Sequence, residues 1–506
     1  MSNKRQNLFY AAFAVVIAGL FAAVTFHYTT HNPIQKDAAQ NTRAAYHLVH
    51  AGVISLDKQA SKTPDPAMRR EPLPIVATAG YLLLHPAFAQ PYTIPELLDG
   101  RLTETVKGVN AFWRFLVVIF LFLLCRELFP DWRVAIAMAL LCLIASESFF
   151  LSRPGIVDRM YTELPEVALM LLASWSAVRF VRGKTKTRAL WLGVTLGLLA
   201  LCKAAFLYIG LGFILLLFVT DRAEHFRPIP GKPGWRSFVL TYAVIALAMF
   251  ATIAPWIVRN AIIFGNPQIA AGTDVTVLGT RMLLTEHTLL GQLYLYSPHA
   301  LKQRVFGPLT GYGEDDLKPG GRLVETSTAK ANRSTTFAER IEAEGYHGDR
   351  SVWVKGKVFN YVVEHPLRYV ASIPVFAYKG MWFMTRAGTL LNLLMLLCFF
   401  GVFFGALFIR NQVLLAAFGL AAGLFFFISV FTHALTRYNQ PMTPFVILSV
   451  LWLIAALARA AYRRFPRLRA LVDPCLRLIQ PASEAKSSSQ RRPTAPTSSA
   501  ETASRA

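Results

Sequence analysis

The chain has 506 residues, of which 54% are hydrophobic and only 16% charged, and its mean hydropathy is +0.41. A soluble core of this length needs far less apolar sequence, so the composition is that of a membrane protein. The net charge of +23 lies in short basic runs between apolar segments, which favours acidic lipid headgroups over nucleic acid as its counterpart. The cysteines form no CxxC pair, so neither a disulfide framework nor a zinc site is expected.

Apolar runs long enough to cross the hydrocarbon of a bilayer recur along the chain. We expect the first, Leu8 to Tyr28, to be an uncleaved helix rather than a signal peptide. The run from Ala189 to Thr220 is long enough for two short helices, so we expect about ten spans or more in all. The other runs are Phe112 to Phe129, Val134 to Leu151, Leu164 to Phe180, Phe238 to Val258, Leu390 to Ile409, Val413 to Phe431 and Pro444 to Ala461.

Basic residues indicate which loops are cytoplasmic, because Lys and Arg near helix ends prefer that side. With both termini in the cytoplasm, the basic loops all fall inside. The segments that then lie outside are 29–109, 152–162, 260–387 and 432–443. We therefore expect one membrane domain over residues 1–465 and a basic, largely disordered cytoplasmic tail over 466–506.

Two shorter apolar stretches, Leu73 to Phe88 and Tyr369 to Phe383, contain proline and polar residues. Making only one of them a span would invert the distribution of basic residues. We expect both to be interfacial or re-entrant helices.

Asp37 is the first residue with a candidate chemical role. It stands just outside the first span, at the start of a predicted helix that ends near Gly52. A carboxylate at the water boundary can deprotonate an acceptor hydroxyl or hold a divalent cation. The alternative is that Asp37 caps this helix or complements its dipole.

Several cations lie where the charge rule does not expect them, and an anionic partner is therefore worth seeking. Arg259, followed by Asn260, and Arg437, followed by Tyr438, are at outer helix ends. A polyprenyl phosphate would supply the anion, because guanidinium binds phosphate bidentately. The alternative for Arg259 is that it snorkels to lipid headgroups.

Lys203 lies inside the apolar run LLALCKAAFLYIG, where an unpaired ammonium is costly. It should reach a cavity, a carboxylate or a phosphate. If the run forms two helices, however, Lys203 lies near their turn and can simply be at the outer surface. Both interpretations remain open at this stage.

Four stretches in order resemble the GT-C superfamily of membrane glycosyltransferases. The first is Asp37 with Tyr46 on the helix that follows and the proline-rich LPIVATAGYLLL, and the others are SRPGIVDRMYTELPEVALMLLA, APWIVRNAIIFGNP and HALTRYNQPMTP. Their order and sidedness, from Asp37 to Pro444, are similar to those of bacterial aminoarabinose-type and dolichyl-phosphate-mannose-type protein mannosyltransferases and of related lipopolysaccharide-core transferases.

The resemblance implies an all-α integral membrane bundle whose helical extracytoplasmic loops cover an outward-facing cavity. The implied reaction moves a sugar from a polyprenyl-phosphate donor to an extracytoplasmic acceptor (lipid, polysaccharide or protein), with inversion, on the periplasmic side of a bacterial-type inner membrane. Asp37 takes the catalytic acidic position. Many members carry two adjacent acids there, whereas Ala38 follows here, so the sequence leaves a divalent metal possible without requiring one.

The resemblance also implies roles for other residues. Asp158 and Glu163 lie near the mouth of the helix that follows, and either can be the second acid of the family; the YTELP spacing favours Glu163. For Asp158 the alternative is a surface pair with Arg153 or Arg159. Arg70 and Glu71 precede the proline-rich stretch and are expected, with Tyr46, to line the cavity.

A transporter or flippase of lipid-linked saccharides is the alternative function. Such a protein would favour internal repeats and charges or broken helices at the middle of the bilayer. No repeat is visible in the sequence, and the unusual charges lie at outer helix ends. The pattern therefore favours the glycosyltransferase.

Overall fold

The structure is a computed structural model that describes residues 3–150, 158–225, 234–271, 281, 289–317, 321, 323, 341–347, 350–432 and 436–465. Throughout these residues the regular elements are helices, as the composition predicts. The chain divides into two compact units, Met1–Leu451 and Trp452–Ala506. Of the second unit only residues 452–465 are described, and the predicted tail, 466–506, lies outside the described residues.

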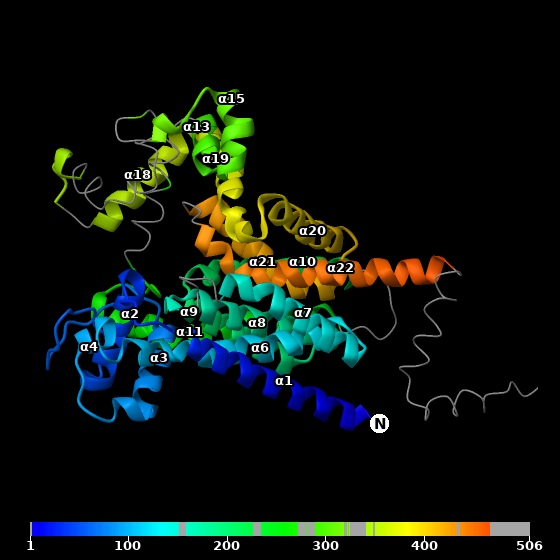
Figure 1. The fold of residues 1–506 in the computed structure, drawn as a ribbon, viewed down its shortest axis with the longest axis horizontal. Coiled ribbons are helices and arrows are strands. Elements are labelled where there is room, and N and C mark those ends of the chain that lie inside the picture. The colour runs from blue at the N-terminus through cyan, green and yellow to red at the C-terminus, as the bar shows by residue number, and fades with distance from the viewer. Residues whose placement is uncertain are drawn as a thin grey trace, which may run out of the picture. The chain divides into compact units, whose positions relative to one another are not determined.

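Long helices occupy all the regions in which spans were predicted (Figure 1). Eight helical stretches among the described residues are long and apolar enough to cross a membrane, and α7 and α9 are further helices in predicted spans. The bounds are α1 (Asn3–His27), α6 (Val109–Leu128), α7 (Trp132–Phe150), α8 (Glu163–Gly183), α9 (Lys186–Cys202), α10 (Ala205–His225), α11 (Trp235–Phe264), α20 (Thr389–Phe408), α21 (Gln412–Phe431) and α22 (Thr443–Arg464).

The apolar run from Ala189 to Thr220 is divided as predicted. α9 ends at Cys202, and α10 begins at Ala205. Lys203 therefore lies at the break between the two helices.

The first predicted extracytoplasmic segment is helical. It contains α2 (Lys36–Ala51), α3 (Pro72–Leu84), η1 (Pro86–Phe88), α4 (Ile94–Asp99) and α5 (Thr103–Lys107). α2 ends at Gly52, whose φ of 68° is in the left-handed region that glycine adopts without strain. α2 packs against α3, and α3 also contacts α9, so this segment lies over the break at Lys203.

The described parts of the second predicted extracytoplasmic segment are also helical. They comprise α13 (Leu289–Tyr296), α14 (His299–Leu301), η3 (Lys302–Phe306), α15 (Gly307–Thr310), η4 (Glu314–Leu317), α18 (Arg350–Glu364), α19 (Pro366–Gly380) and η5 (Trp382–Ala387). α19 packs against α13 and α21. The short element η6 (Thr436–Met442) joins the α21 region to α22.

α8 lies at the centre of the bundle and contacts α6, α9 and α21. Glycines on α9 let its backbone approach α11 closely. A Cβ on Gly193 would lie 2.3 Å from the carbonyl oxygen of Ile245, and one on Gly197 2.5 Å from Cβ of Thr252. α9 also packs against α8, whose first turn carries Glu163 and Glu166.

Candidate functional site

Two arginines hold the carboxylate of Asp37. Its Oδ1 accepts a hydrogen bond from Arg70, and its Oδ2 accepts one of 3.1 Å from Nη2 of Arg437. The N-cap of α2 is Gln35, and Asp37 lies inside the first turn. Asp37 is therefore not the capping residue, although its charge still complements the helix dipole.

Arg70 is the better anchored of the two arginines. Its Nε donates to Oε1 of Gln40 at 2.7 Å, and Gln40 follows Asp37 by one turn of α2. The side chain of Arg70 is 12% exposed, compared with 29% for Arg437. α2 thus presents a carboxylate and an amide that together orient one guanidinium.

Arg437, on η6, brings a second acid to the site. Its Nε lies 4.0 Å from Oε1 of Glu163, in the first turn of α8. The guanidinium also faces the rings of Tyr161 and Tyr438, at 5.0 and 5.4 Å from their centroids. Residues from α2, the start of α8 and η6 therefore meet here, although they are far apart in the sequence.

Two buried polar atoms of this cluster have no hydrogen-bond partner among the described residues, namely Oε2 of Glu163 and Nε of Arg437. Buried polar groups are nearly always satisfied, so unsatisfied ones need a water or a ligand. A neighbouring acceptor and donor left open in one place are typical of a binding site.

An ion pair between a largely buried lysine and a fully buried glutamate lies next to this cluster. Nζ of Lys203 is 2.6 Å from Oε2 of Glu166, whose side chain is 0% exposed. The same ammonium lies 5.3 Å from the ring centroid of Tyr438, and Glu71 accepts a 3.4 Å hydrogen bond from the backbone N–H of Ala204. Lys203 thus lies at a helix break and also reaches a carboxylate, so both interpretations from the sequence describe part of its place.

Charge controls the acidity of Asp37. Burial by itself would raise the pKa of its carboxyl, but the charges and hydrogen bonds of Arg70, and then of Arg437, outweigh burial and lower the pKa. Asp37 is therefore ionised at neutral pH.

Backbone strain occurs beside the same residues. Lys36, next to Asp37, has a φ of 53°, and Met160, next to Tyr161, has a φ of 47°. Positive φ is uncommon for residues other than glycine and clusters at functional sites. These are two of four such residues in the described part of the chain.

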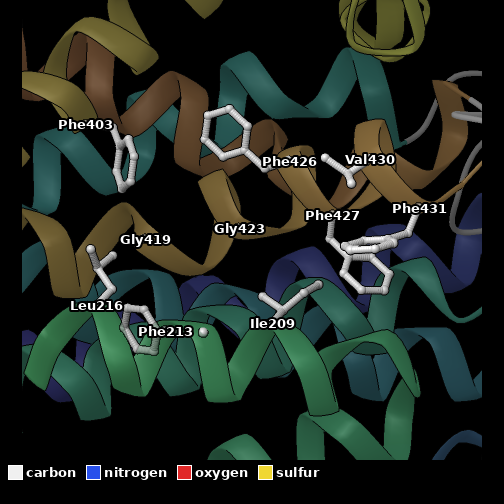
Figure 2. Close-up of a pocket in the computed structure, with 11 residues that line it drawn as sticks. Ile209, Phe213, Leu216, Phe403, Gly419, Gly423, Phe426, Phe427, Val430 and Phe431 are labelled. Carbon is white, nitrogen blue, oxygen red and sulfur yellow. The ribbon is translucent and has the colours of Figure 1, made fainter. Parts of the chain in front are cut away.

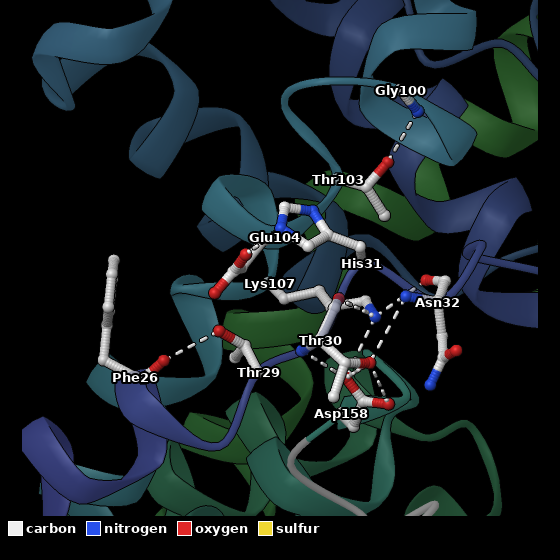
Figure 3. Close-up of polar contacts among 10 residues, drawn as sticks. All are labelled: Phe26, Thr29, Thr30, His31, Asn32, Gly100, Thr103, Glu104, Lys107 and Asp158. Atoms are coloured by element: carbon white, nitrogen blue, oxygen red, sulfur yellow. Dashed lines mark hydrogen bonds and ion pairs between the residues drawn. The ribbon is translucent and has the colours of Figure 1, made fainter.

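Asp158 lies in a different cluster (Figure 3). Its Oδ1 accepts hydrogen bonds from the backbone N–H of Thr30 at 3.0 Å and from Nζ of Lys107 at 2.9 Å. Lys107, 1% exposed, also donates to the carbonyl oxygens of Thr30 and Asn32. Asp158 thus pairs with Lys107 instead of Arg159, and Arg153 lies outside the described residues. The contacts connect the exit of α1 to α5.

Arg259 and Asn260 bind backbone at the end of α11. Arg259 donates to the carbonyl oxygen of Ala67 at 3.2 Å and stacks on Trp256, and Asn260 donates to the carbonyl oxygen of Gln268 at 2.6 Å. Among the described residues, neither contacts Asp37, and no carboxylate pairs with Arg259. Its place as a donor ligand stays a prediction.

Tyr46 follows Asp37 by about nine positions, or two and a half helical turns, and so lies on the opposite face of α2. There its ring packs against His50 and Tyr92. These contacts describe a packed aromatic cluster, and cavity lining by Tyr46 stays a prediction.

The structure therefore connects most of the predicted site residues through one set of contacts, which contains Asp37, Arg70, Glu71, Glu163, Lys203, Arg437 and Tyr438. Sequence analysis missed Gln40, Tyr161 and Glu166. Glu166 had a usable signal, because an acid at the start of an apolar run is a natural partner for the lysine in another such run.

An apolar pocket lies between α10 and α21 (Figure 2). It encloses about 310 Å³, and two glycines of α21 leave room for it, since a Cβ on Gly419 would lie 2.8 Å from the Phe213 ring. Its lining begins at Ile209, in the second turn of α10, and includes Phe431 at the end of α21. The remaining lining residues are Gly212, Phe213, Leu216, Phe403, Gly423, Phe426, Phe427 and Val430.

No metal site is evident in the part of the chain that the structure describes, since no group of three His, Cys, Asp or Glu side chains there could hold an ion. The acids Asp37 and Glu163 have arginine between them, which further disfavours a shared cation.

No family model and no curated protein matches the chain. Among solved structures, it is similar to the archaeal oligosaccharyltransferase AglB from Archaeoglobus fulgidus, in complex with an inhibitory peptide and a dolichol-phosphate. The identity is 13%, the TM-score is 0.47, and the match covers 92% of this chain. The chain spans about half the length of that protein, 52%.

Proposed function

We propose that the chain is an inverting membrane glycosyltransferase that moves a sugar from a polyprenyl-phosphate donor to an extracytoplasmic hydroxyl. The observation that carries the proposal is the meeting of Asp37, Arg437 and Glu163, where two buried polar atoms have no hydrogen-bond partner within the described part of the chain. A carboxylate for proton transfer and a guanidinium for phosphate thus lie within one site, which is what this reaction needs.

In the proposed reaction, Asp37 accepts the proton of the acceptor hydroxyl. The acceptor oxygen attacks the anomeric carbon, the bond from that carbon to the phosphate oxygen breaks, and the carrier leaves as a phosphate monoester. Glu163, whose Oε2 is unpaired, is placed to orient the acceptor or sugar. Arg437 stabilises the charge that grows on the phosphate.

The apolar pocket between α10 and α21 suits the isoprenoid chain of the donor. Its lining is apolar, it begins in the second turn of α10, which follows the break at Lys203, and α21 ends just before the segment that carries Arg437. A phosphate at Arg437 could therefore have its tail between these helices.

The test is sugar transfer by the purified full-length chain in detergent. Radiolabelled polyprenyl-phosphate sugars are offered with an extract of envelope acceptors, and Glu104→Gln, an exposed acid paired with His31 outside the site, is the matched control for Asp37→Asn. Transfer or slow donor hydrolysis that needs Asp37 supports the proposal. Movement of intact donor across vesicles, without chemical conversion, would establish the flippase instead.

A further inference from the structure

Arg437 is shared between Asp37 and the rest of the site. Asp37 uses one carboxylate oxygen for Arg70 and the other for Arg437. Arg70 is held in place by Gln40 as well, whereas Arg437 makes the 3.1 Å bond to Asp37 and approaches Glu163 at 4.0 Å. If one pairing is given up, it is therefore the pairing with Arg437.

A phosphate bound at the buried edge of Arg437 meets an atom that Asp37 uses. Guanidinium binds phosphate best through two parallel N–H groups. Among the described residues, Nε of Arg437 is buried without a hydrogen-bond partner, and the neighbouring Nη2 donates to Asp37. A phosphate that takes this edge bidentately therefore competes with Asp37 for Nη2.

We propose that Asp37 and the carrier phosphate compete for Arg437, so that Asp37 limits the affinity of the site for the carrier and promotes its release. This inference rests on the proposed function. Because coupling between two partners is reciprocal, a phosphate on Arg437 also frees Asp37. The loss of that guanidinium removes one of the influences that lower the pKa of Asp37, so the carboxylate becomes a stronger base when donor is bound.

The competition between Asp37 and the phosphate would help the product to leave. A sugar-linked polyprenyl phosphate is a diester with one negative charge, whereas the released carrier is a monoester with about 1.5 to 2 at neutral pH. The arginine would therefore hold the product more tightly than the donor. When Asp37 pairs with Arg437 again, it offsets this difference in affinity between product and donor.

The experiment measures the binding of a long-chain polyprenyl phosphate to the purified full-length protein in detergent by titration calorimetry. Asp37→Asn keeps the size of the side chain but removes its charge, and it should bind the phosphate roughly tenfold more tightly than wild type, the scale of one hydrogen bond to a charged group. Arg437→Ala should bind more weakly. In the Arg437→Ala background, Asp37→Asn should change the affinity little.

Controls separate the competition from other effects. Glu104→Gln removes another extracytoplasmic acid and should bind like wild type, and a thermal melt of each variant checks that it is folded. Unchanged or weaker binding by Asp37→Asn would overturn the inference alone. Equal tightening in the Arg437→Ala background would overturn it too, because that is general charge repulsion. If neither wild type nor Asp37→Asn binds polyprenyl phosphate, the proposed function fails and the inference fails with it.

Discussion

Asp37 and Asp158 have similar positions in the sequence, each beside a predicted span on its outer side, but different surroundings in the structure. The side chain of Asp37 is 40% exposed and lies between two arginines, whereas that of Asp158 is 10% exposed and bound to Lys107 and to the backbone at Thr30. An acid that keeps access to solvent and to mobile cations can exchange partners during a reaction. One that satisfies buried backbone groups is placed to hold the fold. The difference predicts opposite consequences for the same substitution.

The largest effect on transfer is expected for Asp37→Asn. It should reduce the rate by about a hundredfold or more, the lower end of what a positioned base contributes, while yield and melting temperature stay near wild type. Transfer by the purified variant, normalised to folded protein, measures this. Near-normal transfer would mean that the reaction needs neither the base nor the charge of Asp37, and Glu163 would be tested next.

Arg437→Ala should have the next largest effect. Loss of one hydrogen bond to a charged group costs about 1.5 to 3 kcal/mol, which corresponds to roughly ten- to more than a hundredfold in donor binding or transfer. Arg437→Lys should recover part of this, because it keeps charge without the planar fork. Arg259→Ala provides the comparison, and since Arg259 binds the backbone at Ala67, its effect should be smaller. Equal effects of the two alanine substitutions would indicate that both arginines bind the donor.

Arg70→Ala should shift the pH dependence of transfer more than its maximum. Burial raises the pKa of Asp37 and Arg70 lowers it, so removing Arg70 raises the pKa. The base is then protonated at a higher pH, and the acidic limb of the rate profile moves upward. Rates of wild type and variant between about pH 4 and 8 detect this shift. An unmoved limb would indicate that another group titrates in the reaction.

Asp158→Asn should have the smallest effect on transfer per folded molecule, within about twofold, as for a change away from the reacting groups. It should instead cost stability, on the order of 3 to 5 kcal/mol for a broken buried pair, because Lys107 keeps a buried charge. Thermal melts and transfer assays on the same sample separate these outcomes. A stable variant with little transfer would indicate that Asp158 has a catalytic role.

The sequence was most informative about the helices. Length and hydropathy placed the long helices, and the run around Lys203 was correctly expected to divide. Arg437 and Lys203, which lie in apolar settings and so need partners, both contact carboxylates, while their role toward the donor stays a prediction. The identity of the partner could not be predicted, since Glu166 and Lys203 belong to different helices and meet only through packing.

Asp158 and Tyr46 show what a linear pattern leaves out. The partner of Asp158 is Lys107, from a helix in another segment, and no spacing rule connects them. The direction of the Tyr46 side chain follows from helix geometry, because a residue two and a half turns from Asp37 lies on the opposite face of the helix. A motif gives the order of residues along the chain, and the direction of each side chain must come from the helix that carries it.

The contact between Asp37 and Arg437 also limits the number of times the chain can cross the membrane between these two residues. Two residues that touch on one side require an even number of crossings between them. The described long helices between these residues are α6 to α11, α20 and α21, which is an even number. If α9 and α10 were one continuous crossing, the count would be odd and Arg437 would lie across the bilayer from Asp37. In the topology predicted from the basic residues, the interruption at Lys203 thus keeps Asp37 and Arg437 on the same side of the membrane.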